Sequence, residues 1–154
     1  MHSNLAVQGY CLSAEQGRAL RFGLRLPTGL CLAIVAAGLV LHSAALILAM
    51  VPVGAIAGWT RRHPFDLVWN HGLRHLGGAP ELPPNPAPRR HAFKLATFWL
   101  AGVGGLLAAN ITTAALVAGW MLIGVCGLVT VTNYCIPSTL LALWRRRRAE
   151  AIPA

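Results

Sequence analysis

The stretch LPTGLCLAIVAAGLVLHSAALILAMVPVGAIAGW, residues 26–59, decides the fold class, because it contains no Lys, Arg, Asp or Glu. One straight helix of this length would be about 51 Å long at 1.5 Å per residue, whereas the hydrocarbon core of a bilayer is only about 30 Å thick. The stretch is therefore either one strongly tilted helix or two short helices with a turn near His42 and Ser43. Pro52 is expected to kink the second half.

The composition of the chain identifies the class of protein. Of its 154 residues, 56% are hydrophobic and 11% are charged, whereas about a quarter of the residues in an ordinary soluble domain are charged. This excludes a typical cytosolic globule and a disordered chain. We therefore predict a single, all-α integral membrane domain over residues 1–154. The net charge of +9 lies beside apolar stretches and forms no basic–aromatic platform, so no nucleic-acid partner is expected.

A second uncharged stretch, residues 95–144, is long enough for two more helices. Its natural turn is the Asn-Ile-Thr-Thr sequence that begins at Asn110. This turn divides the stretch into expected helices at 95–109 and 113–134, and Cys135-Ile-Pro-Ser interrupts the second of them.

The basic residues predict the topology. Every Lys and Arg lies within residues 18–25, 61–94 or 145–148, and the positive-inside rule places all three segments in the cytoplasm. The chain must then cross the membrane an even number of times between them. This favours four transmembrane helices as two hairpins, residues 26–59 and 95–137, with a basic tail at 138–154 and both termini cytoplasmic. The residues expected to anchor the helices at the headgroups are Trp59, Trp69, Trp99, Trp144, Arg145, Arg146, Arg147 and Arg148.

Two polar segments flank the first hairpin. Residues 13–25 have the capping-box spacing of Ser13 and Gln16 and a basic face, which predicts either an amphipathic interfacial helix or the start of the first spanning helix. The connection 60–94 is basic and proline-rich. Its residues 65–76 predict a cytoplasmic interfacial helix with Asp66, Asn70 and Arg74 on the polar face. Gly77-Gly78 ends this helix, and residues 80–88 are expected to be extended.

Small residues recur every four positions in the second hairpin and predict the packing seam of the bundle. The alternative is that Ala and Gly are simply common in membrane helices. The predicted packing residues are Thr97, Ala101, Gly105 and Ala109 on the third helix, and Ala115, Gly119, Cys126, Gly127 and Thr130 on the fourth.

Three segments carry a recognisable pattern: HPFDLVWNHGLRHLGG (63–78), PELPPNPAPRRHAFKLATFWL (80–100) and TNYCIPSTL (132–140). The proline-rich connection that ends in Pro-Arg-Arg, and the cysteine near the end of the last helix, resemble the bacterial family catalogued as domain of unknown function 4395. The resemblance covers roughly residues 60–144. It implies a small polytopic protein of the bacterial inner membrane, and it implies no activity. Many members have a glycine- and cysteine-rich end to the last helix, whereas Cys135 stands alone here.

Candidate chemical groups are few. Cys11, Cys31 and Cys135 are all expected near the cytoplasmic side and could exchange disulfides, although single cysteines in membrane helices usually pack as small apolar residues. His71 and His75 share a helix face, but no further ligand stands at metal-binding spacing, so no metal is expected. His42 is either an intramembrane ionisable group or a solvated turn residue. No catalytic carboxylate pair, triad or phosphate loop is present.

The absence of catalytic groups predicts a non-enzymatic protein without a cofactor. Its expected partners are the lipid bilayer and larger membrane proteins, for which it would be an accessory or scaffolding subunit. A second hypothesis is a thiol-based redox protein that uses Cys135 with Cys11 or Cys31. A third is a small oligomeric channel or carrier whose pore would be lined by Thr112, Thr113, Thr130, Thr132 and Asn133.

Overall fold

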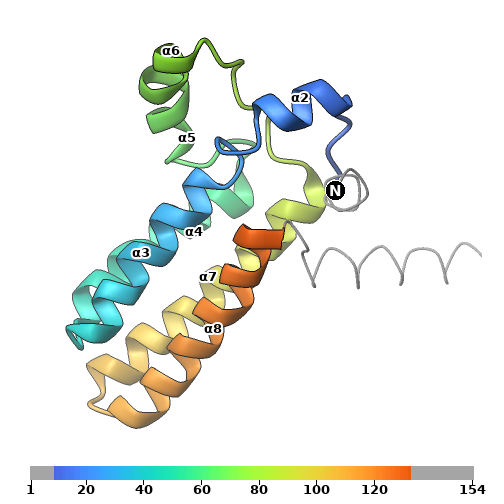
Figure 1. The fold of residues 1–154 in the computed structure, drawn as a ribbon. Helices are drawn as coiled ribbons and strands as arrows, with labels where there is room; N and C mark the ends of the chain where they lie inside the picture. Colours follow the sequence, from blue (N-terminus) through green and yellow to red (C-terminus); the bar gives the residue numbers. More distant parts are fainter. Residues whose placement is uncertain (1–8, 133–154) are drawn as a thin grey trace, which may run out of the picture.

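The computed structural model describes residues 9–132, and every regular element within that range is a helix, as the sequence predicts (Figure 1). The elements are α2 (Ala14–Ala19), α3 (Leu26–Val40), α4 (Ala44–Trp59), α5 (Asp66–Val68), the π-helix η1 (Trp69–Leu73), α6 (Arg74–Gly77), α7 (Ala87–Ala108) and α8 (Thr112–Thr132). The expected residues Asn133, Cys135, Trp144 and Arg145 to Arg148 lie outside the described range.

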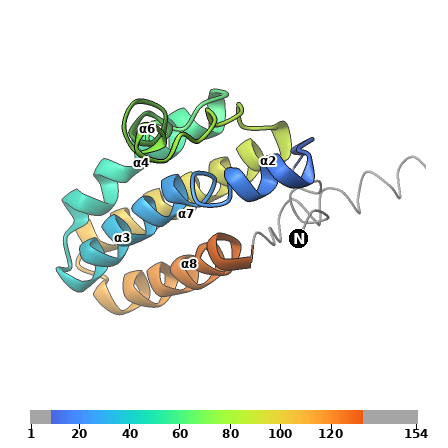
Figure 2. The ribbon, with the colours of Figure 1, turned by 45° about the horizontal axis from the view of Figure 1, so that its top comes forward.

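The four long helices, α3, α4, α7 and α8, lie side by side, and the short elements gather at one end of them (Figures 1 and 2). The most extensive contact is between α4 and α7, and α3 packs against both α4 and α8. Because α7 also packs against α8, the four helices form a closed ring of neighbours. We call the group of short elements at the end of this bundle the polar layer: residues 9–25 and 60–90.

Two tight turns close the other end of the bundle. His42 and Asn110 have φ angles of 49° and 59°, a left-handed conformation that Asn and His adopt more readily than most residues. Ser43 caps α4 through a hydrogen bond from the Leu46 backbone N–H to its Oγ at 3.3 Å. The chain therefore reverses at the two positions that the sequence singles out.

The helices differ in length. α7 and α8, with 22 and 21 residues, are long and apolar enough to cross a membrane, whereas α3 and α4 have only 15 and 16 residues. At 1.5 Å per residue the shorter pair is about 23–24 Å long, less than the ~30 Å of a hydrocarbon core. Length and composition thus identify two candidate spans among residues 9–132.

α7 begins eight residues earlier than expected, at Ala87 instead of Leu95. Pro88 stands in its first turn, where the missing N–H costs no hydrogen bond, and Pro86 lies just before it. The expected extended stretch is therefore shorter than predicted and ends at Pro86. As a consequence Arg89, Arg90 and Lys94 are held on a helix.

The packing seam also differs from the prediction. Thr97, Ala115 and Gly119 are buried, and Ala101 is half-buried, but Gly105 and Ala109 are exposed. A strict four-residue repeat turns by about 40° per step around a helix of 3.6 residues per turn, so Ala109 lies about 120° away from Thr97. The real seam takes steps of three, four and three residues through Thr97, Leu100, Gly104 and Leu107, and Val103 is buried beside Gly104.

Glycines of α4 complete this seam. A Cβ atom on Gly54 would lie 2.5 Å from Thr97 Oγ1, and one on Gly58 would lie 2.8 Å from Lys94 Cγ. These close approaches bring α4 against α7, the most extensive contact of the bundle. The predicted seam included no residue of α4.

Candidate functional site

Among the described residues, the buried polar side chains outside the helix seam all lie in the polar layer. They are His63, Asp66, Asn70 and Asn85. Burying such groups is costly unless they are hydrogen-bonded. Their partners therefore show what the layer is built to do.

His63 is the link between the polar layer and the bundle. Its Nδ1 accepts a hydrogen bond from the Phe65 backbone N–H at 3.1 Å, and its Nε2 lies 3.6 Å from Cys31 Sγ on α3. Because Nδ1 is an acceptor, the neutral ring carries its proton on Nε2 and directs it at the sulfur. Burial, together with the nearby Arg89, lowers the pKa of His63 to about 4. At neutral pH the ring is thus an uncharged donor and cannot take a proton from Cys31.

Asp66 fixes the turn in which His63 lies. Its Oδ2 accepts a hydrogen bond from the His63 backbone N–H at 2.7 Å. Burial raises the pKa of Asp66, while this hydrogen bond and the charges of Arg89 and Arg62 act in the opposite direction. The Asp66 carboxylate therefore stabilises the turn at His63 and points into the polar layer.

Arg89 ties three segments together. Its Nη1 donates to Tyr10 Oη at 2.7 Å, and its Nη2 donates to the Leu24 carbonyl at 2.9 Å. Tyr10 in turn donates to Asn85 Oδ1 at 2.9 Å, and burial raises the pKa of Tyr10. The network joins the N-terminal segment, the start of α3, the proline-rich connection and α7.

The helix expected at residues 65–76 is present, but its polar face is turned inward. Asp66 and Asn70 are buried, and Asn70 Oδ1 accepts from the Leu82 N–H at 3.0 Å. The π-helix η1 widens the turn at Trp69–Leu73 and brings Trp69 inward beside Asn70. Leu76, by contrast, is 86% exposed. Gly78, with φ of 60°, ends the helix as expected.

The expected tryptophan anchors have different roles in the structure. Trp69 is only 6% exposed, and its Nε1 donates to the Pro80 carbonyl at 3.2 Å, so it is a core residue of the polar layer. Trp99 donates from Nε1 to the Ala118 carbonyl of α8 at 3.1 Å and joins two helices. Trp59 is exposed, and Lys94 Nζ lies 4.9 Å from its ring centroid. Of these three tryptophans, Trp59 is the most exposed.

Of the three candidate redox cysteines, Cys11 and Cys31 lie among the described residues and Cys135 does not. Cys11 is exposed in the segment before α2, while Cys31 is half-buried. Cys31 and Cys126 line one partly open interior cavity, which is bounded by all four long helices, and His63 lies at its edge. The sequence had assigned Cys126 to packing alone, because nothing in its spacing indicates that α8 places it near Cys31.

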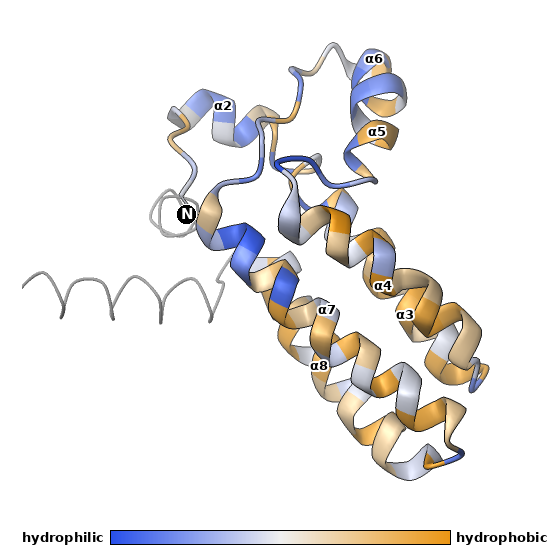
Figure 3. Ribbon diagram, turned by 180° about the vertical axis from the view of Figure 1, so that it is seen from behind, coloured by the Kyte–Doolittle hydropathy of each residue, from blue (hydrophilic) through white to orange (hydrophobic). Residues whose placement is uncertain are grey.

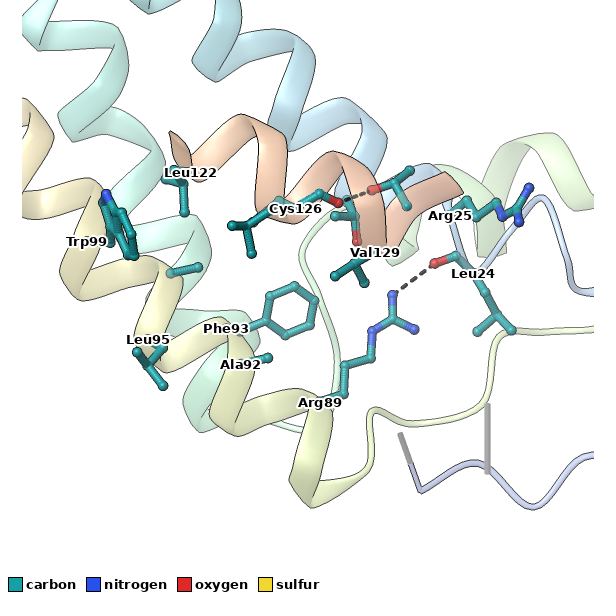
Figure 4. Close-up of a pocket in the computed structure, with 14 residues that line it drawn as sticks. Leu24, Arg25, Arg89, Ala92, Phe93, Leu95, Trp99, Leu122, Cys126 and Val129 are labelled. Atoms are coloured by element: carbon teal, nitrogen blue, oxygen red, sulfur yellow. Dashed lines mark hydrogen bonds between the residues drawn. The ribbon is translucent and has the colours of Figure 1, made fainter. Parts of the chain in front are cut away.

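A larger cleft opens between α7 and α8 at the end nearest the polar layer (Figure 4). Its volume is about 880 Å³, including the part open to solvent, and its lining is mostly apolar. Phe93 and Trp99 come from α7, and Val125 and Val129 from α8, while Arg25 and Arg89 stand at the polar end. Phe93, Ala96, Leu122 and Cys126 line both the cleft and the interior cavity.

The remaining candidate groups form no site. Among residues 9–132 no group of three or more His, Cys, Asp or Glu side chains could hold a metal ion, and His71 and His75 are exposed. His42 is an exposed turn residue. The hydroxyls of Thr130 and Thr132 donate to carbonyls of their own helix.

The described residues define a class of protein: two apolar helical hairpins joined by a basic, internally hydrogen-bonded layer. The chain belongs to the family described as Domain of unknown function (DUF4395), which matches residues 21–146. The matched range contains all four long helices and the connection that carries His63 and Arg89. No curated protein and no solved structure matches the chain.

Proposed function

We propose that the protein crosses the bacterial inner membrane four times, with the polar layer and both termini in the cytoplasm. The observation that carries this proposal is the separation of hydrophilic from hydrophobic residues along the molecule (Figure 3). Every charged side chain of the described part lies at residues 15–25 or 61–94. The helices beyond them expose large apolar side chains on their outer faces: Val40, Leu46, Leu48, Ile56, Phe98, Val117, Trp120, Met121, Val125 and Leu128.

The short first hairpin is compatible with this placement. The mismatch of about 6–7 Å between α3 or α4 and the hydrocarbon core costs fractions of a kcal/mol per Å. Local thinning of the bilayer can accommodate it. The alternative is that α7 and α8 cross the membrane and the first hairpin does not.

Labelling with a membrane-impermeant maleimide in a cysteine-free background distinguishes the two arrangements. Leu41→Cys and Ile111→Cys lie at the two bundle turns and are exposed. Both should react in cells whose outer membrane alone is permeabilised, and Glu81→Cys only after the inner membrane is opened. Reaction of Ile111→Cys without Leu41→Cys would show that the first hairpin does not cross.

We further propose that the protein is a non-enzymatic accessory subunit of a larger membrane complex. Two polar groups of the layer support this role, because their atoms bond to other parts of the same chain: His63 through Nδ1 and Nε2, and Arg89 through both Nη atoms. Leu67, Val68, Leu73 and Leu76 form an exposed apolar face on α5, η1 and α6. This face is available for a partner at the cytoplasmic surface.

The test is purification from membranes in mild detergent. The wild-type chain should co-purify with a larger membrane protein, and Leu76→Glu should lose that partner while the chain itself remains folded. Leu41→Glu, a matched change at an exposed residue of the opposite end, should retain it. Purification of the wild-type chain alone, or equal loss with both variants, refutes the accessory role.

A thiol redox protein is the second candidate, and the cavity that Cys31 and Cys126 share favours it. Cys31 and Cys126 would then give two electrons and two protons to a partner disulfide and become a disulfide themselves. Mild oxidation of the detergent-purified protein should form a Cys31–Cys126 disulfide, detected by peptide mass spectrometry, in wild type and in Cys11→Ser. Its absence would exclude this pair.

A further inference from the structure

We propose that the cleft between α7 and α8 binds one anionic phospholipid, with an acyl chain in the apolar part and the phosphate at Arg25 and Arg89. The proposal rests on the membrane placement proposed above. It assigns a ligand class to a site that the fold builds from residues far apart in the sequence: Arg25 at the start of α3, Arg89 in α7 and Val129 in α8.

The apolar part of the cleft suits a hydrocarbon chain. Its lining is almost entirely apolar and includes Phe93, Leu95 and Val129. The rim residues Leu95, Trp99 and Val125 are exposed, so the cleft opens sideways on the apolar outer surface, where a lipid chain can enter directly from the bilayer. Figure 4 shows Phe93 and Val129 facing each other across it.

The polar end of the cleft carries the positive charges of Arg25 and Arg89. Among the described residues the one ion pair is Arg62–Glu81, with 3.1 Å between Nη1 and Oε1, so neither Arg25 nor Arg89 has a carboxylate partner there. Arg25 donates from Nη2 to the Val131 carbonyl at the end of α8, but its Nε is buried and has no hydrogen-bond partner. A buried N–H donor without a hydrogen-bond partner is costly.

A phosphate group supplies what is missing at this end. Its oxygens can accept from Arg25 Nε, and its charge compensates the two guanidinium groups. A zwitterionic lipid offers no net negative charge.

The experiment is native mass spectrometry of the full-length, detergent-purified protein mixed with equal amounts of dioleoyl phosphatidylglycerol and dioleoyl phosphatidylcholine. We expect one phosphatidylglycerol to be retained per chain, in preference to phosphatidylcholine. Arg25→Gln should weaken its retention at least about tenfold, the effect of losing a charged hydrogen bond. Arg21→Gln, which removes the same charge at an exposed residue outside the cleft, should leave it unchanged.

A second pair of variants tests the apolar part without changing any charge. Val129→Trp should fill the cleft and abolish retention, while Val117→Trp, on an exposed face of α8, should retain the lipid. Equal retention of both lipids, equal effects of Arg25→Gln and Arg21→Gln, or retention by Val129→Trp would each overturn the proposal. Failure of the membrane placement would appear separately, as a chain that leaves membranes without detergent.

Discussion

The pair Gly119→Ala and Gly124→Ala offers the sharpest test of the bundle, because the two changes are chemically identical and lie in the same helix. A Cβ atom on Gly119 would lie 2.5 Å from Leu39 Cδ2 and 3.2 Å from Leu39 Cγ. Leu39 is completely buried, so it has little room to move away. A Cβ atom on Gly124 would meet nothing within 4 Å.

The expected magnitudes follow from two opposing terms. Both variants gain about 1 kcal/mol from the higher helix propensity of Ala. Gly119→Ala also incurs an overpacking cost of about 1–3 kcal/mol at the contact between α3 and α8. The free energy of unfolding of Gly119→Ala should therefore be about 1–3 kcal/mol lower than that of Gly124→Ala.

The assay is reversible unfolding in mixed micelles, titrated with a denaturing detergent and followed by circular dichroism. Gly124→Ala should be as stable as wild type or more stable, and Gly119→Ala should be less stable than Gly124→Ala. Equal stabilities of the two variants would refute the contact between Gly119 and Leu39, and with it the packing of α3 on α8.

Three further predictions concern the polar layer. Gly23→Ala would place a Cβ 2.6 Å from Trp69 Cε2 and should destabilise the layer by about 1–3 kcal/mol in thermal unfolding, whereas Gly29→Ala, with nothing within 4 Å, should not. Tyr10→Phe leaves Asn85 Oδ1 and Arg89 Nη1 without their partner and should lower the free energy of unfolding by about 1–3 kcal/mol. The loss should appear as faster proteolysis of residues 9–25. An unchanged rate of proteolysis would contradict the network. The pKa of His63 is lowered from 6.5 to about 4 in the folded chain. As pH falls through 6.5, the unfolded chain therefore binds a proton at His63 and the folded chain does not. The free energy of unfolding should drop by about 2 kcal/mol between pH 7.5 and pH 5. His63→Gln should remove this drop in stability, and His42→Gln should not. The raised pKa of Asp66 changes stability in the opposite direction, but Asp66 is present in the wild type and in both variants. A pH profile that is unchanged in His63→Gln would show that His63 titrates normally.

The sequence by itself determined the helical class, the family and the positions of both turns. Each depends on a local signal: an uncharged stretch, a motif, or a polar turn residue within an apolar run. The capping box of Ser13 and Gln16 is present for the same reason, since its partners are three residues apart.

The tertiary structure decided which faces point inward. The four-residue repeat suggested Gly105 and Ala109 for the seam, but the helix turns them away, and Gly54 and Gly58 of α4 take part in the real contact. The polar face of residues 65–76 was expected outside, yet Asp66 and Asn70 find backbone partners inside. Cys31, His63 and Cys126, like Arg25, Arg89 and Val129, come together through contacts between helices distant in the sequence, and such contacts leave no periodic signal in the chain.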